Sequence, residues 1–133
     1  LSPAVFSQHP IMLRLGGEFY VRSIQRVEAD GSLVFYCAVD NGIVLTVGEG
    51  ADLTGNLAET LSEVERAIGP PALVLGCDCI LRQLEVEQRG LQARVNEVIS
   101  RFPYVGFKSY GEQIGGVHVN QTLTGVALGA NPA

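Results

Sequence analysis

Apolar and polar positions alternate loosely over the first third of the chain, which is the pattern of strands rather than of helices. Residues 19–27 follow this pattern, a turn is indicated at residues 29–32, and residues 33–39 form the next strand-like run. Asn41-Gly42 then favours a tight type I′ turn, after which residues 43–47 run back. The pattern predicts a three-stranded antiparallel meander.

Helical spacing replaces this alternation in the next segment. Asn56 and Glu59 fit a capping box, and Asp52 and Thr54 are rival caps one turn earlier. Gly69-Pro70-Pro71 would end the helix. The apolar positions that recur at helical spacing are Leu57, Leu61, Val64 and Ile68. We therefore predict an amphipathic helix that packs one face on a sheet.

The second half of the chain adds further strands and one more helix. Residues 72–77 are a continuous apolar run, which is typical of a buried strand. Residues 80–101 show helical periodicity with a possible break at Gly90, and residues 104–110 and 117–128 read as the last two strands. The order of elements is therefore β-β-β-α-β-α-β-β.

This order predicts an α+β fold in which an antiparallel sheet of about six strands is covered by two helices. Residues 1–13 are apolar, contain two prolines and are interpreted as an extended segment that joined a preceding domain. Residues 14–133 form the predicted domain.

Composition restricts the possible partners and setting. The net charge of −5 and the isoelectric point near 4.9 argue against nucleic acid or an anionic membrane as the main partner. No apolar run approaches the roughly 20 residues that span a bilayer. The three cysteines, Cys37, Cys77 and Cys79, have no framework spacing, which favours a reducing cytoplasm.

Polar groups are unusually dense in residues 110–124. The hydrogen-bonding side chains there include those of Tyr110, Glu112, Gln113, His118, Asn120 and Thr122. Burying so many polar groups without partners is costly, so they either satisfy one another or face a ligand. Glu112 and His118 flank one loop, and could serve acid–base chemistry, ligand capture or metal ligation, or could simply fasten the hairpin.

Two further patterns add candidate residues. Asn120, Thr122 and Thr124 share one parity on the last predicted strand, so this face is either solvated or binds something polar. Asp78 suits a helix N-cap, and Arg82 one turn later could pair with it or bind a ligand carboxylate through two hydrogen bonds.

The usual catalytic and metal-binding patterns are not found. His9 and His118 lack a second histidine at ligand spacing, and Cys77-x-Cys79 is not a zinc-knuckle spacing. There is no phosphate-binding loop and no nucleophile elbow. We expect a protein that is not an enzyme; catalysis would require Glu112 and His118 as an acid–base pair, with Cys77 as nucleophile.

Three short motifs carry a resemblance to a known family: Cys77-Asp78 with Arg82, the stretch from Gly106-Phe107 to Tyr110-Gly111-Glu112, and Asn120-Gln121-Thr122. Together they resemble the C-terminal half of the FIST family of intracellular sensory domains, over residues 10–130. The resemblance implies a bacterial-type cytoplasmic sensor of small ligands, such as amino acids, which works beside a FIST N-terminal half. It also implies signalling partners such as a histidine kinase, a cyclic-dinucleotide enzyme or a chemoreceptor.

From this resemblance we expect a non-catalytic sensory domain. Arg82 would hold an anionic group, Glu112 an ammonium or hydroxyl, and Asn120 and Thr122 would orient the ligand. The further site candidates are Tyr110, His118, Gln113, Cys77 and Asp78. Some relatives are haem-based sensors of nitric oxide, and His118 would be the axial ligand, but its polar neighbours lead us to expect no cofactor. A module that only binds partners is a further alternative.

Overall fold

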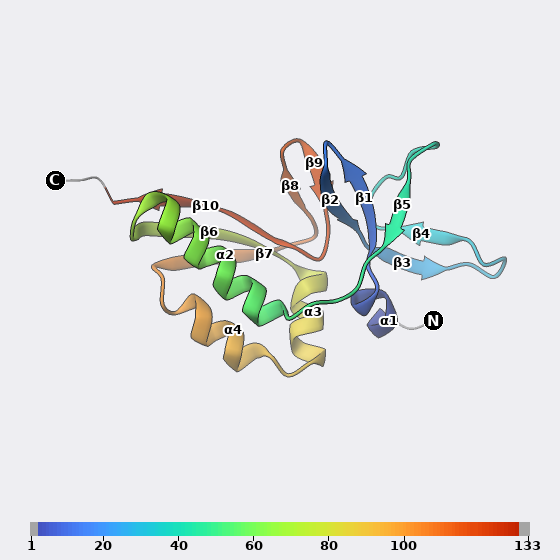
Figure 1. The fold of residues 1–133 in the computed structure, drawn as a ribbon. Coiled ribbons are helices and arrows are strands. Elements are labelled where there is room, and N and C mark those ends of the chain that lie inside the picture. Colours follow the sequence, from blue (N-terminus) through green and yellow to red (C-terminus); the bar gives the residue numbers. More distant parts are fainter. Residues whose placement is uncertain (1–2, 131–133) are drawn as a thin grey trace.

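The computed structural model describes residues 3–130 and contains four helices and ten strands within that range (Figure 1). The helices are α1 (Pro3–Gln8), α2 (Leu53–Ile68), α3 (Ile80–Gln88) and α4 (Gln92–Ile99). The strands are β1 (Ile11–Leu15), β2 (Glu18–Arg22), β3 (Ile24–Val27), β4 (Leu33–Phe35), β5 (Leu45–Val47), β6 (Pro71–Cys79), β7 (Tyr104–Ser109), β8 (Glu112–Ile114), β9 (Val117–Val119) and β10 (Leu123–Gly129).

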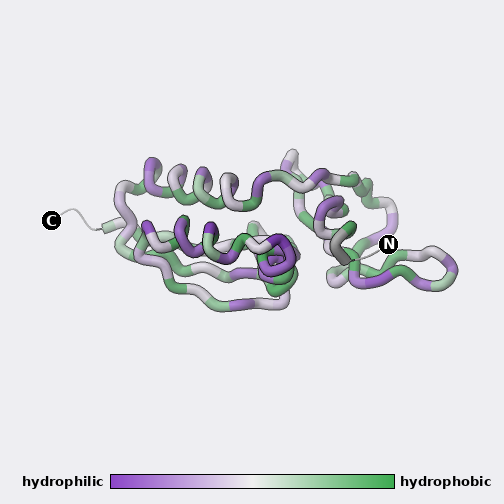
Figure 2. Tube along the Cα trace, turned by 90° about the horizontal axis from the view of Figure 1, so that it is seen from below, coloured by the Kyte–Doolittle hydropathy of each residue, from purple (hydrophilic) through white to green (hydrophobic). Residues whose placement is uncertain are grey.

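One end of the molecule is a three-stranded sheet with helices on one side. Strand β6 is central, with β10 antiparallel on one edge and β7 parallel on the other. Figure 2 shows the helices lying together on one side of this layer of strands. The hydrophobic core lies between them and consists of Leu57, Leu61, Val74 and Val98. We call this part, made of β6, β7, β10 and α2–α4, the helix-covered sheet.

The other end is built almost entirely from short strands. A sheet of order β2-β1-β5 stands beside the pairs β3-β4 and β8-β9 (Figure 1). Leu13 in β1 and Val119 in β9 are its buried apolar side chains, among the residues whose burial is described. We call this part, made of α1, β1–β5, β8 and β9, the strand-rich part.

The predicted first helix is confirmed as α2, and its N-cap is Asp52, one of the two alternatives to Asn56. The carboxylate of Asp52 accepts a hydrogen bond from the backbone N–H of Thr54, 3.1 Å away, so Asp52 rather than Asn56 caps α2. Gly69 ends the helix at a φ of 75°, a conformation that suits glycine. Leu57 and Leu61 are buried, as the helical spacing predicted.

The α+β fold is confirmed, but a single antiparallel sheet of six strands is wrong. The described strands form four sheets, and β6 and β7 run parallel. The connection explains the parallel pairing, because α3 and α4 carry the chain back across the sheet before β7 begins.

The predicted three-stranded meander is also wrong. Strand β4 pairs with β3, whereas β5 pairs with β1, so no hairpin joins residues 33–39 to residues 43–47 around Asn41-Gly42. Ser23 separates β2 from β3 within the first predicted strand. The leading residues are helical in α1 and then form the central strand of a sheet, rather than being extended throughout. Their origin in a linker to a preceding domain stays a prediction.

Glycines divide two of the predicted elements. The second predicted helix is broken at Gly90, which has a φ of 64° and separates α3 from α4. The polar stretch after β7 forms its own hairpin, β8–β9, which turns at Gly115-Gly116 with φ values of 55° and 81°. This hairpin leads into β10.

Candidate functional site

Arg82 and Asp78 form a nearly buried ion pair where β6 passes into α3. Nη1 of Arg82 lies 3.0 Å from both carboxylate oxygens of Asp78, and Arg82 is 6% exposed. Burial raises the pKa of the Asp78 carboxyl above its usual value, and the Arg82 guanidinium opposes this shift. The prediction that Asp78 caps the N-terminus of this helix is wrong, because Cys79 occupies the N-cap position of α3.

A pocket of about 260 Å³ opens beside this ion pair, between α2, α3 and the beginning of β10. Its polar side chains come from Arg82, Asn56, Thr60, Gln121 and Thr122, and its apolar wall is Leu53, Leu57 and Leu123. Two predicted site residues, Arg82 and Thr122, therefore line one pocket. We call it the Arg82 pocket.

Glu112 lies behind this pocket rather than in its lining. It is almost fully buried and accepts hydrogen bonds from the hydroxyls of Ser109 and Thr122, with Thr122 Oγ1 2.6 Å from Glu112 Oε2. Thr122 thus faces the pocket while its proton is directed toward a buried carboxylate. The structure brings Glu112 and Thr122 together, as predicted, and adds Ser109.

Asn120 is the most completely buried polar side chain in this region. It has no exposed surface, and neither its Oδ1 nor its Nδ2 has a hydrogen-bond partner among the described residues. It packs close to Gly111, where a Cβ would lie 3.0 Å from Asn120 Nδ2. An unpaired buried amide costs about 1–3 kcal/mol, so the side chain of Asn120 lowers the free energy of unfolding.

Gln121 links the Arg82 pocket to the strand-rich part. Its backbone is left-handed, with a φ of 57°, which is unusual for a residue other than glycine. Its Nε2 donates to Glu85 Oε2 at 2.9 Å and to the carbonyl of Ser7 at 3.1 Å, and its Oε1 accepts from the Ser23 hydroxyl. One side chain therefore contacts α1, α3 and the end of β2.

His118 does not join Glu112. In the hairpin, Glu112 pairs with Val119, while His118 pairs with Gln113, so the carboxylate and the imidazole lie on opposite faces. The His118 ring turns its Nε2 edge against Gly111 and is exposed to solvent. The acid–base pair that catalysis would have required is not formed.

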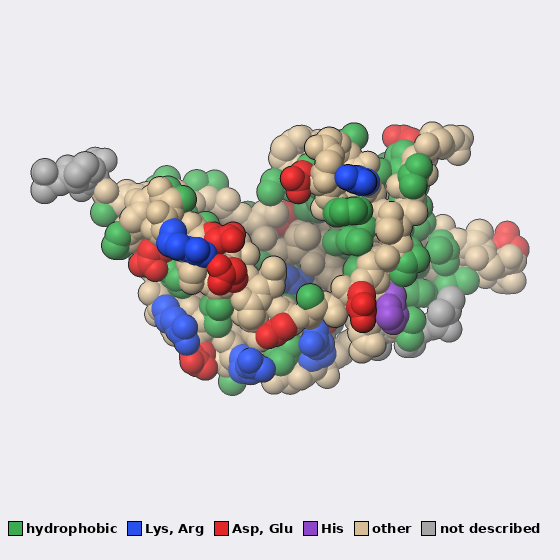
Figure 3. Space-filling view, in the orientation of Figure 1, with side chains coloured by type: hydrophobic (Ala, Val, Ile, Leu, Met, Phe, Trp, Pro, Cys, Tyr) green, Lys and Arg blue, Asp and Glu red, His purple; other side chains and the backbone are tan. Residues whose placement is uncertain are grey.

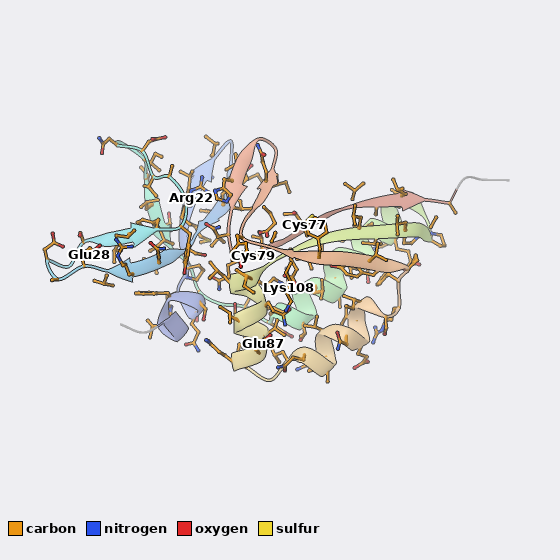
Figure 4. The ribbon with its side chains drawn as sticks, turned by 180° about the vertical axis from the view of Figure 1, so that it is seen from behind. Arg22, Glu28, Cys77, Cys79, Glu87 and Lys108 are labelled. Atoms are coloured by element: carbon orange, nitrogen blue, oxygen red, sulfur yellow. The ribbon has the colours of Figure 1, made fainter. Side chains whose placement is uncertain are left out.

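The remaining predicted residues are dispersed. Tyr110 is 89% exposed and Gln113 is exposed, so neither lines the Arg82 pocket. Cys77 is half-buried at the end of β6 near Cys79 and Lys108 (Figure 4). Asn120, Thr122 and Thr124 do not share a strand face, because β10 begins only at Leu123.

A second pocket, of about 600 Å³, was not anticipated from the sequence. It lies in the strand-rich part, and its lining includes Arg22, Cys37 and His118. Arg22 is 7% exposed and donates from Nη1 to the carbonyl of His118. No signal in the sequence distinguishes this arginine, because its burial depends on packing between distant segments.

The described residues contain neither a metal-binding cluster nor a membrane-spanning helix. Among the described residues, no group of three or more His, Cys, Asp or Glu side chains is placed to hold a metal ion. Within the same range, no helix has the length and apolar character needed to cross a membrane.

Comparison with known proteins places the chain in a family. The family model described as the FIST C domain matches residues 1–115, which confirms the resemblance and ends before residues 118–124. This family is a sensory-type domain implicated in signal transduction. No curated protein and no solved structure gives a significant match.

Proposed function

We propose, since the chain belongs to the FIST C domain family, that it is a cytoplasmic sensory domain that binds a small polar ligand with the two charges of an amino acid. Ligand binding would be its whole role, without a catalytic step. It would act beside a FIST N-terminal half and pass its state to a signalling partner such as a histidine kinase, a cyclic-dinucleotide enzyme or a chemoreceptor.

The observation that supports this proposal best is the position of Arg82. Its Nη1 is held by Asp78, while its Nε and Nη2 groups have no hydrogen-bond partner among the described residues. The residue lines a pocket of about 260 Å³, a volume that suits a single amino acid better than a larger metabolite. A guanidinium fixed on one side by a carboxylate keeps its remaining donors oriented for a ligand carboxylate.

Thr122 is suited to receive the ammonium group. Its hydroxyl proton is directed to Glu112, so the oxygen lone pairs remain available on the side of the pocket. The buried negative charge of Glu112 makes this oxygen a better acceptor for a cation. Glu112 would therefore act through Thr122 rather than touch the ligand, and Asn56 and Thr60 could orient the ligand from α2.

Haem binding, the alternative, receives less support from this geometry. The imidazole Nε2 of His118, which would approach the iron, is turned against Gly111 and lies near the amide of Asn120. The surroundings of His118 therefore do not fit an axial ligand to haem. We expect the protein to be colourless and to give no sharp Soret band when haem is added. A stoichiometric Soret shift that is lost in His118→Ala would contradict this.

The test is a thermal-shift screen of zwitterionic amino acids and their derivatives, carried out on the protein and on matched variants. A ligand at about 100 times its dissociation constant adds about 2.7 kcal/mol to the free energy of unfolding. Arg82→Lys retains the charge opposite Asp78 but loses the planar fork, so the shift should be lost while the fold remains. Arg101→Lys, at an exposed position just after α4, serves as the control.

A second pair of variants separates ligand binding from a module that only binds partners. Thr122→Val removes the hydroxyl in the pocket, whereas Thr124→Val removes one on β10 outside it. We expect the ligand response to disappear only in Thr122→Val. If no zwitterion stabilises the protein, or if Thr122→Val responds like the wild type, the proposed ligand site is wrong.

A further inference from the structure

Arg22 is a nearly buried cation, and none of the described residues gives it an acidic partner. It is 7% exposed, and its side chain donates hydrogen bonds to two carbonyls, those of His118 and of Val21, the latter at 3.4 Å. The ion pairs among the described residues are Arg26–Glu28, Arg66–Glu59, Arg82–Asp78, Arg89–Glu85 and Arg101–Glu97. Arginine is rarely buried without a counter-charge, because removing an unpaired charge from water is costly.

This arginine faces the larger of the pockets described above. Figure 4 shows Arg22 between β2 and the β8–β9 hairpin, and its side chain lines the cavity of about 600 Å³. The apolar part of the wall includes Leu13, Leu15, Ala38, Ile43, Val44 and Val117. Such a volume and such walls are typical of sites for small organic molecules.

The charges around the cavity favour an anion. Arg14 and Arg22 line it, against one carboxylate, Asp40, which is exposed. The other titratable groups in the lining are the Cys37 thiol and the exposed His118. Burial raises the pKa of the Cys37 thiol, with Arg22 opposing the shift, so the thiol does not supply the missing negative charge at neutral pH.

We propose that this cavity is a second binding site, for a small molecule that carries one carboxylate on an apolar body. The carboxylate binds Arg22 and supplies its counter-charge, and the apolar body lies against Leu13, Ile43 and Val117. The site is built from β1, β2, the segment between β4 and β5, and the β8–β9 hairpin. It shares no lining residue with the Arg82 pocket, so it does not depend on the function proposed above.

Cys37 makes the cavity directly testable. Its thiol is half-buried in the lining, so a ligand in the cavity shields it from an alkylating reagent. We would measure the rate of Cys37 alkylation by peptide mass spectrometry with octanoate as the probe. Octanol tests the apolar body without the charge, and acetate tests the charge without the body. At about ten times its dissociation constant octanoate should slow the reaction about tenfold, because only the unoccupied protein reacts.

Two variants should abolish this protection. Arg22→Gln removes the charge but keeps a donor for the carbonyl of His118. Val44→Asp places a negative charge in the lining at a side chain that is 76% exposed, so it should spare the fold even if Arg22→Gln does not. Arg66→Gln, on the exposed face of α2, is the control and should be protected like the wild type.

The outcomes separate this proposal from the Arg82 pocket. Protection by octanoate alone, lost in Val44→Asp and in any folded Arg22→Gln protein, supports the site even if no amino acid binds elsewhere. Equal protection by octanol, full protection in Val44→Asp or in Arg22→Gln, or no protection by octanoate at millimolar concentrations would each overturn it.

Discussion

In the helix-covered sheet, apolar side chains from α2, β6 and α4 pack against one another, whereas the strand-rich part buries mainly polar groups. The core of the first consists of Leu57, Leu61, Val74 and Val98. In the second, Arg22, Ser23 and Glu112 are buried, with Leu13 and Val119 as the buried apolar side chains among the described residues. Both parts also expose large apolar side chains, such as Phe19 and Val44 in the second and Val105 and Phe107 in β7 of the first. Figure 3 shows charged side chains over the helices and apolar ones gathered over the strands of the other end.

This difference indicates how the two parts are joined. Among the described residues, the side-chain hydrogen bonds that join them are made by Gln121 to Ser7, Ser23 and Glu85, and by Glu112 in β8 with the hydroxyls of Ser109 in β7 and of Thr122 before β10. Polar contacts of this kind can be broken and remade more readily than a close-packed core. The helix-covered sheet is therefore suited to hold its shape, and the strand-rich part to move relative to it.

The largest expected effect comes from opening the core. Leu61→Ala should lower the free energy of unfolding by about 2–5 kcal/mol, because it removes buried methyl groups and leaves a cavity. Leu45→Ala in β5, where the leucine is exposed, should cost less than about 1 kcal/mol. Urea denaturation measures both. Equal losses would contradict the comparison, since they would show that the strand-rich part is packed as tightly as the other.

Gln121 is the next position at which the comparison can be tested. Gln121→Ala should lower stability by about 1–3 kcal/mol, because the buried polar groups of its partners lose their hydrogen bonds. Gln121→Gly loses the same bonds but tolerates a φ of 57°, so it should be about 1 kcal/mol more stable than the alanine variant.

Hydrogen exchange shows where the effect of these variants lies. We expect faster exchange in β1 and β2 of both variants and unchanged exchange in β6, because β6 is held by the core. Uniform acceleration throughout the chain would show that Gln121 supports the whole fold rather than the junction.

The elements that the sequence predicts well are those whose signals are local. Helix α2 follows from an N-cap, an apolar stripe and a terminal glycine, all within one segment. The partner of β5 was missed because its choice of β1 over β4 is made by packing between distant segments. The parallel β6–β7 pair could have been predicted, since two strands joined by a helical crossover usually run parallel.

The candidate site could be predicted in part for the same reason. Arg82 was found because it lies one helical turn after Asp78, and Thr122 because it lies in a dense polar stretch. Residues 111–116 were predicted as the loop between the last two strands, and the β8–β9 hairpin was missed, although Gly115-Gly116 between Ile114 and Val117 is itself a hairpin signal. Once that hairpin forms, Glu112 and His118 must lie on opposite faces. The buried state of Arg22 depends on tertiary packing, which no local pattern encodes.

The two parts also differ in the direction in which they shift the pKa of an aspartate, and a titration can measure this difference. Burial raises the pKa of Asp78 above its ordinary value of 3.8, whereas hydrogen bonds from Ser32 lower the pKa of the exposed Asp30. NMR titration of the carboxyl carbons should therefore find Asp78 protonated first as the pH falls.

The two shifts affect stability with opposite signs. The raised pKa of Asp78 means that its contribution is most favourable at low pH and is lost as the pH rises from 3.8 through the folded-state pKa. Asp30 contributes stability above 3.8 and loses it as the pH falls through its lowered pKa. A lower pKa for Asp78 than for Asp30 would mean that the Arg82 ion pair outweighs burial.

The smallest effect is expected for exposed ion pairs, and one from each part allows the comparison. Arg26–Glu28 lies in the strand-rich part at 2.8 Å and Arg101–Glu97 at the end of α4 at 2.9 Å, and all four side chains are well exposed. Glu28→Gln and Glu97→Gln should each change the free energy of unfolding by less than about 0.5 kcal/mol, and the change should vanish in high salt. Because solvent screens both pairs alike, the two variants should not differ. A larger loss of unfolding free energy for Glu28→Gln than for Glu97→Gln would contradict this. It would mean that surface ion pairs, and not mainly the hydrogen bonds of Gln121, stabilise the strand-rich part.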